Sequence, residues 1–453
     1  MSKKFDPAAL SDFARYYGFH YDRIDSFGLI EDVLVEMQRG LDGRSSSLPM
    51  IPAYISFGAS AETAANEKAG KTVIALDAGG TNLRSALVQF DQNGKVIITD
   101  SLQAPMPGTY GRLGEKDFFS KIADVTVPLI KKSDSKIEGI GFCFSYPMEI
   151  TKEADGILLA LSKEVDAPEV IGKPIGKSLK TALSNQHADV PEKIVLLNDT
   201  VATLLSGMNE FHGDFSRAPL VGFILGTGFN TAYLEKRIDK IGFDGSNQSD
   251  EQQSRQIVVC ESGNFAHRYM GFLDREYDAT TKNSNSYSLE KAASGAYLGP
   301  LTFHIIKQAI RDGVFSFLRM DDFLAIPALQ TKDLNAFLTN PHDPHNSLGS
   351  LFGADEKGAL SSVVYLASIV TERAALLSAA MVAAAVEKSG DCFDPFAQGG
   401  IAVEGTTYIR YSGMRRALES YLHVMLNRKK PRPYTIAPVQ QASLLGAAAA
   451  ALS

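Results

Sequence analysis

Two polar residues interrupt an apolar run in the segment VLLNDTVATLLSG, residues 195–207. Asn198 and Asp199 follow a strand-like stretch, and burial of the run would remove hydration from the Asp199 carboxylate. Neither a helix interior nor a strand interior favours an Asn-Asp pair. The pair therefore either ends the strand at a turn or lies in a cleft, where a carboxylate can take part in chemistry.

A glycine turn in DAGGTN, residues 77–82, has the composition of a phosphate-binding loop. Its glycines let the backbone approach a ligand and present N–H groups to an anion, and its polar side chains add hydrogen bonds. Asp77, at the end of a strand, can hold a magnesium ion through water. The candidate phosphate contacts are Gly79, Gly80, Thr81, Asn82 and Arg84.

A second turn of the same kind occurs in LGTGFN, residues 225–230, where the candidate phosphate contacts are Gly226, Thr227 and Gly228. Neither turn has the lysine of a P-loop or the third glycine of a dinucleotide fingerprint. A single glycine turn is more often structural. Both turns, however, lie between two strand-like runs and are followed by an Asn, and they are roughly 150 residues apart. This internal repeat predicts two related half-molecules whose turns bind a phosphate chain from both sides.

Alternating strand-like and helix-like segments must position these residues, and they predict an α/β chain. At 453 residues the chain exceeds what one hydrophobic core usually serves, so two domains with a cleft between them are expected. The pattern predicts a helix over 28–43, an extended segment over 48–56, a hairpin over 72–90, a polar, mobile stretch over 103–117, strands over 137–150 and 193–199, a strand-turn-strand over 219–236, a surface excursion over 239–256 and mostly helices after 286.

Composition narrows the class of protein. A net charge of -7 argues against a broad nucleic-acid surface, which needs clustered Lys and Arg. Three widely spaced cysteines and an N-terminus unlike a signal peptide favour a reducing compartment, the cytoplasm. The apolar stretch from Ala374 is too short for a bilayer of about 30 Å and predicts a buried, Ala-rich core helix, with no membrane association.

Taken in order along the chain, these motifs resemble those of a hexokinase, within the superfamily of sugar kinases, actin and heat-shock ATPases. The likeness runs from LPMIPAYIS nearly to the C-terminus. ALDAGGTNLR and GTGFNTAYLE resemble the two phosphate motifs of the family, GFCFSYP its sugar-site strand, and LLNDTVATLLSG its catalytic segment. FLDREYD and LEKAASGAYLG resemble its large-domain sugar motifs, and VEGTTY, residues 403–408, its adenosine-side segment.

The resemblance implies roles for individual residues. It makes Asp199 the general base and Asn198 a ligand of a sugar hydroxyl. The other sugar contacts that it implies are Ser145, Ser162, Lys163, Asn230, Glu261 and Glu290. On the nucleotide side it adds Gly405 and Thr406. Carboxylates and amides suit a sugar, because each hydroxyl both donates and accepts a hydrogen bond.

The implied reaction is transfer of the γ-phosphoryl group of ATP, with Mg²⁺, to the 6-hydroxyl of a hexose, glucose first, as in the first step of glycolysis. The implied fold is a two-domain actin-like ATPase (ribonuclease H-like) fold with a cleft between a small and a large domain. The predicted limits are 71–200 plus 436–453 for the small domain and 1–70 plus 201–435 for the large one. The implied partners are a hexose and ATP, and the implied assembly is a monomer or homodimer.

Two stretches depart from the family pattern. Residues 161–165 read LSKEV where the family commonly has Trp-Thr-Lys-Gly-Phe, and Ser262 replaces a Trp after Glu261. These departures bear on sugar preference. Two alternatives are a sugar sensor that has lost the chemistry and an actin-like or chaperone ATPase. Retention of Asp77, Asn198 and Asp199 favours an enzyme over a sensor, and the set of sugar contacts favours a kinase over an ATPase.

Overall fold

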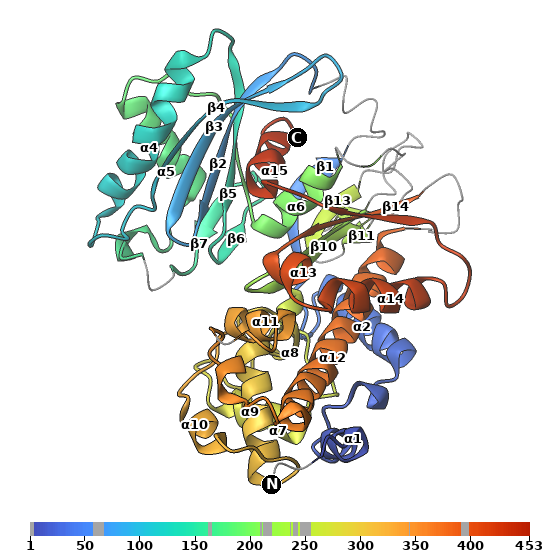
Figure 1. Cartoon of the computed structure of the whole chain (residues 1–453). Helices are drawn as coiled ribbons and strands as arrows, with labels where there is room; N and C mark the ends of the chain where they lie inside the picture. Colours follow the sequence, from blue (N-terminus) through green and yellow to red (C-terminus); the bar gives the residue numbers. More distant parts are fainter. Residues whose placement is uncertain are drawn as a thin grey trace.

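The computed structural model of the chain describes residues 4–57, 68–161, 165–208, 211, 220–235, 237–238, 243–244, 255–343, 345–390 and 398–453. Two β-sheets organise these residues, and helices cover both of them (Figure 1). The mixture of strands and helices confirms the predicted α/β class.

The smaller sheet has five strands, in the order β4 (Val96–Pro105), β3 (Asn82–Phe90), β2 (Thr72–Gly79), β5 (Ile137–Phe144) and β8 (Ile194–Leu197). β2, β5 and β8 run parallel, whereas β2 and β3 form the predicted antiparallel hairpin. The side chains of β2 alternate between two cores. Ile74 and Leu76 pack with α4 (Glu115–Lys132) and α5 (Ile175–Asn185), and Val73 and Ala75 pack with α15 (Ala442–Ala450).

The larger sheet has six strands, in the order β1 (Ile51–Phe57), β13 (Arg255–Val259), β10 (Phe229–Glu235), β9 (Leu220–Leu225), β14 (Gly399–Glu404) and β15 (Tyr434–Pro438). Around it lie α1 (Pro7–Tyr16), α2 (Ser26–Leu41), α7 (Phe272–Ala279), α8 (Ser288–Ala293), α9 (Leu298–Arg311), α10 (Met320–Ala325), α11 (Thr331–Thr339), α13 (Thr406–Arg410) and α14 (Met414–Leu426). Two short ribbons pair β6 (Met148–Ile150) with β7 (Gly156–Leu158) and β11 (Arg237–Ile238) with β12 (Phe243–Asp244).

The predicted Ala-rich helix is the second half of α12 (Lys357–Ser389), which packs against β9, β10, α2 and α14. By length and composition α12 is able to cross a membrane, but 94% of its most apolar window is buried inside the protein. It therefore forms the core helix that the sequence predicts.

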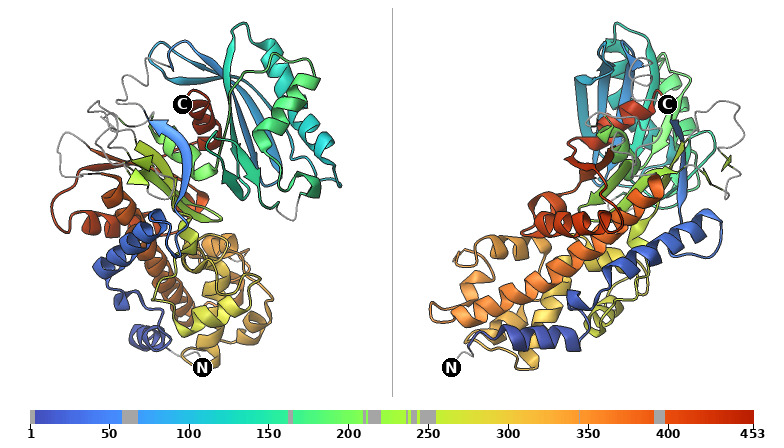
Figure 2. Two further views of the ribbon diagram at one scale, coloured as in Figure 1. Left: turned by 180° about the vertical axis from the view of Figure 1, so that it is seen from behind. Right: turned by 90° about the vertical axis from the view of Figure 1, so that its right-hand side faces the viewer.

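Two helices join the sheets. α6 (Asp199–Gly207) and α15 share one hydrophobic core with residues from both sheets, among them Val73 of β2 and Ala232 of β10. Both views in Figure 2 place α15 between the two parts of the molecule. The contact is close: a Cβ on Gly446 of α15 would lie 2.1 Å from the carbonyl oxygen of Ala202 of α6.

Several predicted boundaries differ from the structure. The strand predicted over 137–150 is interrupted between β5 and β6, at a segment that contains Pro147, which has no N–H for a sheet. Residues 103–105 belong to β4 rather than to a mobile stretch. Most of the predicted excursion over 239–256 lies outside the described residues, but Arg255 and Gln256 are buried in β13. The domain limits stay a prediction, and the limit at residue 436 falls inside β15.

Candidate active site

The carboxyl ends of three parallel strands meet at one edge of the smaller sheet. Asp77 of β2 is paired with Cys143 of β5, and Cys143 with Leu197 of β8. The residues that follow these positions therefore emerge together, and they include Ser145 and Asn198. In α/β sheets, ligands bind in the crevice beyond such strand ends.

Asn198 and Asp199 begin a helix. Asn198 is the N-cap of α6, and its Oδ1 accepts a hydrogen bond from the Val201 N–H at 2.9 Å. Asn is among the best N-cap residues, and the helix dipole stabilises a carboxylate in the first turn. The strand predicted over 193–199 is therefore too long, because β8 ends at Leu197 and Asp199 is the first residue of α6.

A cavity of about 360 Å³ opens at this point between the two sheets. Five of the predicted sugar-site residues line it: Ser145, Asn198, Asp199, Asn230 and Glu261. Its remaining wall is largely apolar and includes Ile51 of β1, Met148 of β6 and Val259 of β13. Ser162 and Lys163 lie outside the described residues. The described part of the predicted sugar set thus converges on one cavity, except for Glu290.

Hydrogen bonds fix the polar side of the cavity. Asn230 Nδ2 donates to Glu261 Oε1 at 3.0 Å, and Asn230 Oδ1 accepts from the Ser262 N–H at 3.2 Å. Glu261 has a left-handed φ of 53°, a conformation that is rare for residues other than Gly and Asn and that is found at functional sites. Glu290 accepts from the Phe229 N–H at 3.1 Å, so it lies behind the β9–β10 turn.

Burial raises the pKa of each carboxyl group near this cavity. Burial raises the pKa of Asp199, and the neighbouring Asp77 carboxylate raises it further, against the hydrogen bonds from Thr200. Burial also raises the pKa of Glu261 and Glu290. Perturbed carboxylates gathered in a cleft mark a candidate catalytic site, and a base with a raised pKa is a better proton acceptor.

Glu404 is a half-buried carboxylate that the sequence analysis did not select. Its Oε2 accepts from the Thr203 hydroxyl of α6 at 3.2 Å. Burial raises its pKa, and the charges of Asp199 and Asp77 add to this effect. In the sequence, only its position directly before Gly405 marks Glu404 as a candidate. Its hydrogen-bond partner Thr203 lies some two hundred residues earlier in the chain, so no local pattern joins the two residues.

Asp77 and Arg84 face each other across the β2–β3 hairpin. Arg84 Nε donates to Asp77 Oδ2 at 2.9 Å. Burial raises the pKa of Asp77, and Arg84 opposes this shift. The described residues contain no group of three His, Cys, Asp or Glu side chains that could hold a metal ion directly. A magnesium ion fits Asp77 only as an ion held mainly by water and phosphate oxygens, which is how Mg²⁺ commonly binds with nucleotides.

The first glycine turn closes the hairpin with a left-handed Gly80, φ 59°. The Tyr146 hydroxyl donates to the Gly80 carbonyl oxygen at 2.9 Å and holds the turn beside the sugar-side cavity. Thr81 and Asn82 are exposed, and Gly79 lies against Ser145, whose Oγ would be 3.4 Å from a Cβ on Gly79. The turn thus presents exposed polar groups next to the strand ends.

The second glycine turn packs against the start of α13. Gly405 has φ 125°, and a Cβ at this position would lie 2.2 Å from the Leu225 carbonyl oxygen. The Gly226 carbonyl oxygen accepts from the Thr407 hydroxyl at 2.8 Å. The structure therefore brings together the predicted nucleotide residues Gly226, Thr227, Gly228, Gly405 and Thr406.

A second cavity, of about 340 Å³, opens beside this turn. Two predicted residues, Thr227 and Thr406, line it. The other lining residues were not selected from the sequence: Gly295, Ala296, Thr331, Lys332, Asn335, Thr407, Arg410 and Tyr411. No sequence signal marks Lys332 or Asn335, which lie on the ordinary amphipathic helix α11. Asn335 bridges to the segment after α13, because its side chain bonds Arg410 O and Ser412 N.

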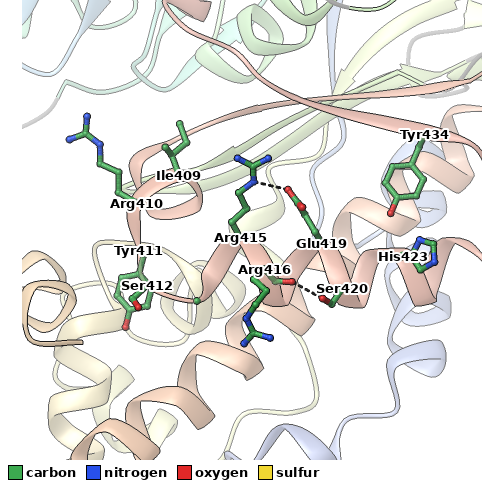
Figure 3. A pocket seen from close by; sticks show the side chains of 11 residues that line it. Ile409, Arg410, Tyr411, Ser412, Arg415, Arg416, Glu419, Ser420, His423 and Tyr434 are labelled. Atoms are coloured by element: carbon green, nitrogen blue, oxygen red, sulfur yellow. Dashed lines mark hydrogen bonds and ion pairs between the residues drawn. The ribbon is translucent and has the colours of Figure 1, made fainter. Parts of the chain in front are cut away.

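A third, open cavity of about 960 Å³ lies over α13 and α14 (Figure 3). Its cations are largely paired, since Arg415 Nε donates to Glu419 at 2.8 Å and Arg416 bonds Glu372 at 3.2 Å. None of the carboxylates with raised pKa values described above lines this cavity. Among the three cavities, only the one of about 360 Å³ is lined by carboxylates with raised pKa values, those of Asp199 and Glu261.

Comparisons with known proteins agree with this geometry. Residues 17–209 match one hexokinase family model, and residues 220–453, slightly more than half of the chain, match another. Hexokinase-1 of Saccharomyces cerevisiae is 27% identical over 448 residues, which cover 94% of this chain and 88% of that protein. Hexokinase-1 of Oryza sativa subsp. japonica is 28% identical over 446 residues, covering 91% and 84%.

Solved structures share the fold. A Schistosoma mansoni hexokinase in complex with glucose has a TM-score of 0.74 at 22% identity, covering 99% of this chain and 100% of that one. Another hexokinase crystal structure has a TM-score of 0.76 at 22% identity and covers 99% of both chains. These neighbours have the predicted two-domain actin-like ATPase fold. By fold and by family models, the chain belongs to the hexokinase family, the hexose phosphotransferases.

Proposed function

We propose that this hexokinase-family chain is an active kinase that transfers the γ-phosphoryl group of Mg-ATP to the 6-hydroxyl of a hexose. The observation that carries the proposal is the position of Asp199. This half-buried carboxylate has a raised pKa, lines the sugar-side cavity and begins a helix whose Thr203 bonds Glu404, next to the nucleotide-side Gly405. Glucose is the first candidate, because the Schistosoma mansoni structure contains it.

In the proposed reaction, Asp199 accepts the proton of the 6-hydroxyl as this oxygen attacks the γ-phosphorus, and ADP leaves. Asn198, Asn230, Glu261 and Glu290 orient the sugar. The N–H groups of the two glycine turns stabilise charge on the moving phosphoryl group. Asp77 would hold a Mg²⁺ ion through water, and the bound ion would supply positive charge to the phosphate groups. The second cavity, beside Thr227 and Thr406, is the proposed place for the adenosine end of ATP.

The first test measures ADP release with and without a panel of hexoses. Release that depends on a hexose supports the kinase, and release that does not depend on sugar indicates an ATPase. Sugar binding without ADP release indicates the sensor, the second candidate function, which the polar groups that line the 360 Å³ cavity would also serve.

The second test is Asp199→Asn. We expect this variant to keep the fold and hexose binding and to lose turnover by about 10²–10⁴-fold, the range for loss of a general base. Ser206→Ala, which removes a buried hydroxyl of the same helix and lines neither cavity, is a matched control for damage to α6. Near-normal turnover of Asp199→Asn would remove Asp199 from the mechanism.

A further inference from the structure

Glu290, the proposed sugar contact outside the cavity lining, lies on α8, a helix of six residues. A helix this short does not form alone in water, because its first N–H and last C=O groups have no partners within the helix. Its N-cap, Tyr287, has φ 57° and makes no side-chain cap bond. The position of Glu290 therefore depends on what holds α8 in place.

Lys291, the next residue, holds α8 against α7. Its side chain is only 4% exposed, and its Nζ pairs with Asp278 at the end of α7. The same Nζ donates to the Asn283 carbonyl oxygen at 2.6 Å, and the Lys291 N–H donates to the Tyr287 carbonyl oxygen at 2.9 Å. A lysine is almost never buried to this extent unless it is paired.

Asp278 accepts hydrogen bonds from the loop between α7 and α8. Its carboxylate accepts from the Asn285 N–H at 2.7 Å and from the Ser284 hydroxyl at 3.3 Å. Burial opposes ionisation of this group, but Lys291 and the loop bonds outweigh burial and lower the pKa of Asp278. Asp278 is therefore ionised at neutral pH and binds Lys291 as a carboxylate.

The helix α7 is itself fixed to the core. Arg373 of α12 donates to both oxygens of Asp274 on α7, at 2.6 and 2.7 Å. At the other end, Glu290 lies within contact of the second glycine turn, because a Cβ on Gly228 would be 3.1 Å from Glu290 Oε2. Hydrogen bonds and ion pairs thus link α12 to α7, α7 to α8, and Glu290 of α8 to the second glycine turn.

We propose that the buried pair of Lys291 and Asp278 positions the sugar site, setting Glu290 and Tyr287 against the bound hexose. This inference rests on the proposed function, in which Glu290 binds the sugar. Lys291 and Asp278 are positioning residues, because neither lines the sugar-side cavity, whereas Tyr287 does. Their loss should weaken hexose binding and leave ATP binding unchanged.

The test compares Asp278→Asn and the double variant Asp278→Asn/Lys291→Met with the wild type. The double variant leaves no unpaired buried charge, so it tests the pair even if the single variant does not fold. Glu387→Gln is the matched control, because Glu387 belongs to another buried ion cluster, with Arg428 and Arg432. Hexose KM, ATP KM, kcat, calorimetric hexose affinity and Tm are measured for each protein.

We expect the hexose KM to rise about tenfold in both pair variants and the ATP KM to stay within about twofold, since a weakened hydrogen bond to a charged group has this size. Glu387→Gln should lower Tm without changing either KM. An unchanged hexose KM, or equal rises in both KM values, overturns the proposal. If the wild type binds a hexose but releases no ADP, only the proposed function fails. The calorimetric hexose affinity of the pair variants, compared with that of the wild type, then tests the role of Lys291 and Asp278. A wild type that binds no hexose overturns both.

Discussion

Replacement of Gly405 by alanine tests how closely the nucleotide-side segments pack. Gly405 has φ 125° and ψ 138°, which other residues rarely adopt, and a Cβ would lie 2.2 Å from Leu225 O and 2.6 Å from Gly226 N. Backbone strain of this kind costs about 1–3 kcal/mol. Overpacking adds about 1–3 kcal/mol. We expect Gly405→Ala to lower the free energy of unfolding by about 2–6 kcal/mol, the sum of these two costs.

Gly413→Ala is the matched control. Gly413 also has a positive φ, 82°, but the nearest atom to its Cβ would be Thr371 Cγ2 at 3.9 Å, an ordinary contact. This variant should therefore show the strain cost alone, about 1–3 kcal/mol. Urea denaturation followed by far-UV circular dichroism measures both variants, and the difference between them isolates the clash.

Gly405→Ala should also affect the KM for ATP more than the KM for the hexose. Relief of the clash requires the turn at Gly226 to move, and misplacement of a binding group by about 1 Å can cost 10²-fold. We expect the ATP KM of Gly405→Ala to rise by about tenfold or more, with the hexose KM within about threefold. Equal destabilisation by Gly405→Ala and Gly413→Ala, together with an unchanged ATP KM, would refute the packing argument.

Two further predictions concern titration. Burial raises the pKa of Asp199, and a base must be ionised to accept a proton. The acid-side fall of kcat/KM should therefore have its midpoint at a higher pH than ~4, the pKa of an ordinary aspartate. A midpoint at or below ~4 in a pH–rate profile would contradict this. Burial lowers the pKa of His267 to about 4, whereas an unfolded His has a pKa near ~6.5. The stability that the neutral His267 contributes should be fully present above pH ~6.5 and should be lost between pH ~6.5 and about 4, by about 3 kcal/mol. Urea denaturation of the wild type and of His267→Gln across this pH range measures the loss, and the free energy of unfolding of the variant should fall less.

Patterns within single segments predicted much of the fold and site. The glycine turns, the β2–β3 hairpin and the buried helix α12 follow from periodicity and from glycine placement in one stretch each. The helix start at Asn198 could also be predicted, since an Asn before DTVATLLSG is an N-cap signal, but the apolar run favoured a longer strand.

Contacts between distant segments account for what the sequence did not predict. Glu404 accepts a hydrogen bond from Thr203, two hundred residues away in the chain, and neither residue type indicates such a partner. Likewise, Lys332 lines the second cavity only because α11 lies beside the end of α13, where Asn335 bonds Arg410 O. Single-segment patterns contain no information on these pairings, because burial and pKa depend on the assembled neighbours.

The position of α15 has a consequence for synthesis of the chain. Val73 and Ala75 of β2 face a core that α15 completes, and α15 begins at Ala442, some 360 residues after β2 ends. At about 5–20 residues per second, the ribosome needs roughly 20–70 s to make this stretch. During that time the inner face of the smaller sheet lacks α15 and exposes apolar side chains of β2. The strands of this sheet are therefore made long before the core on its inner face can close.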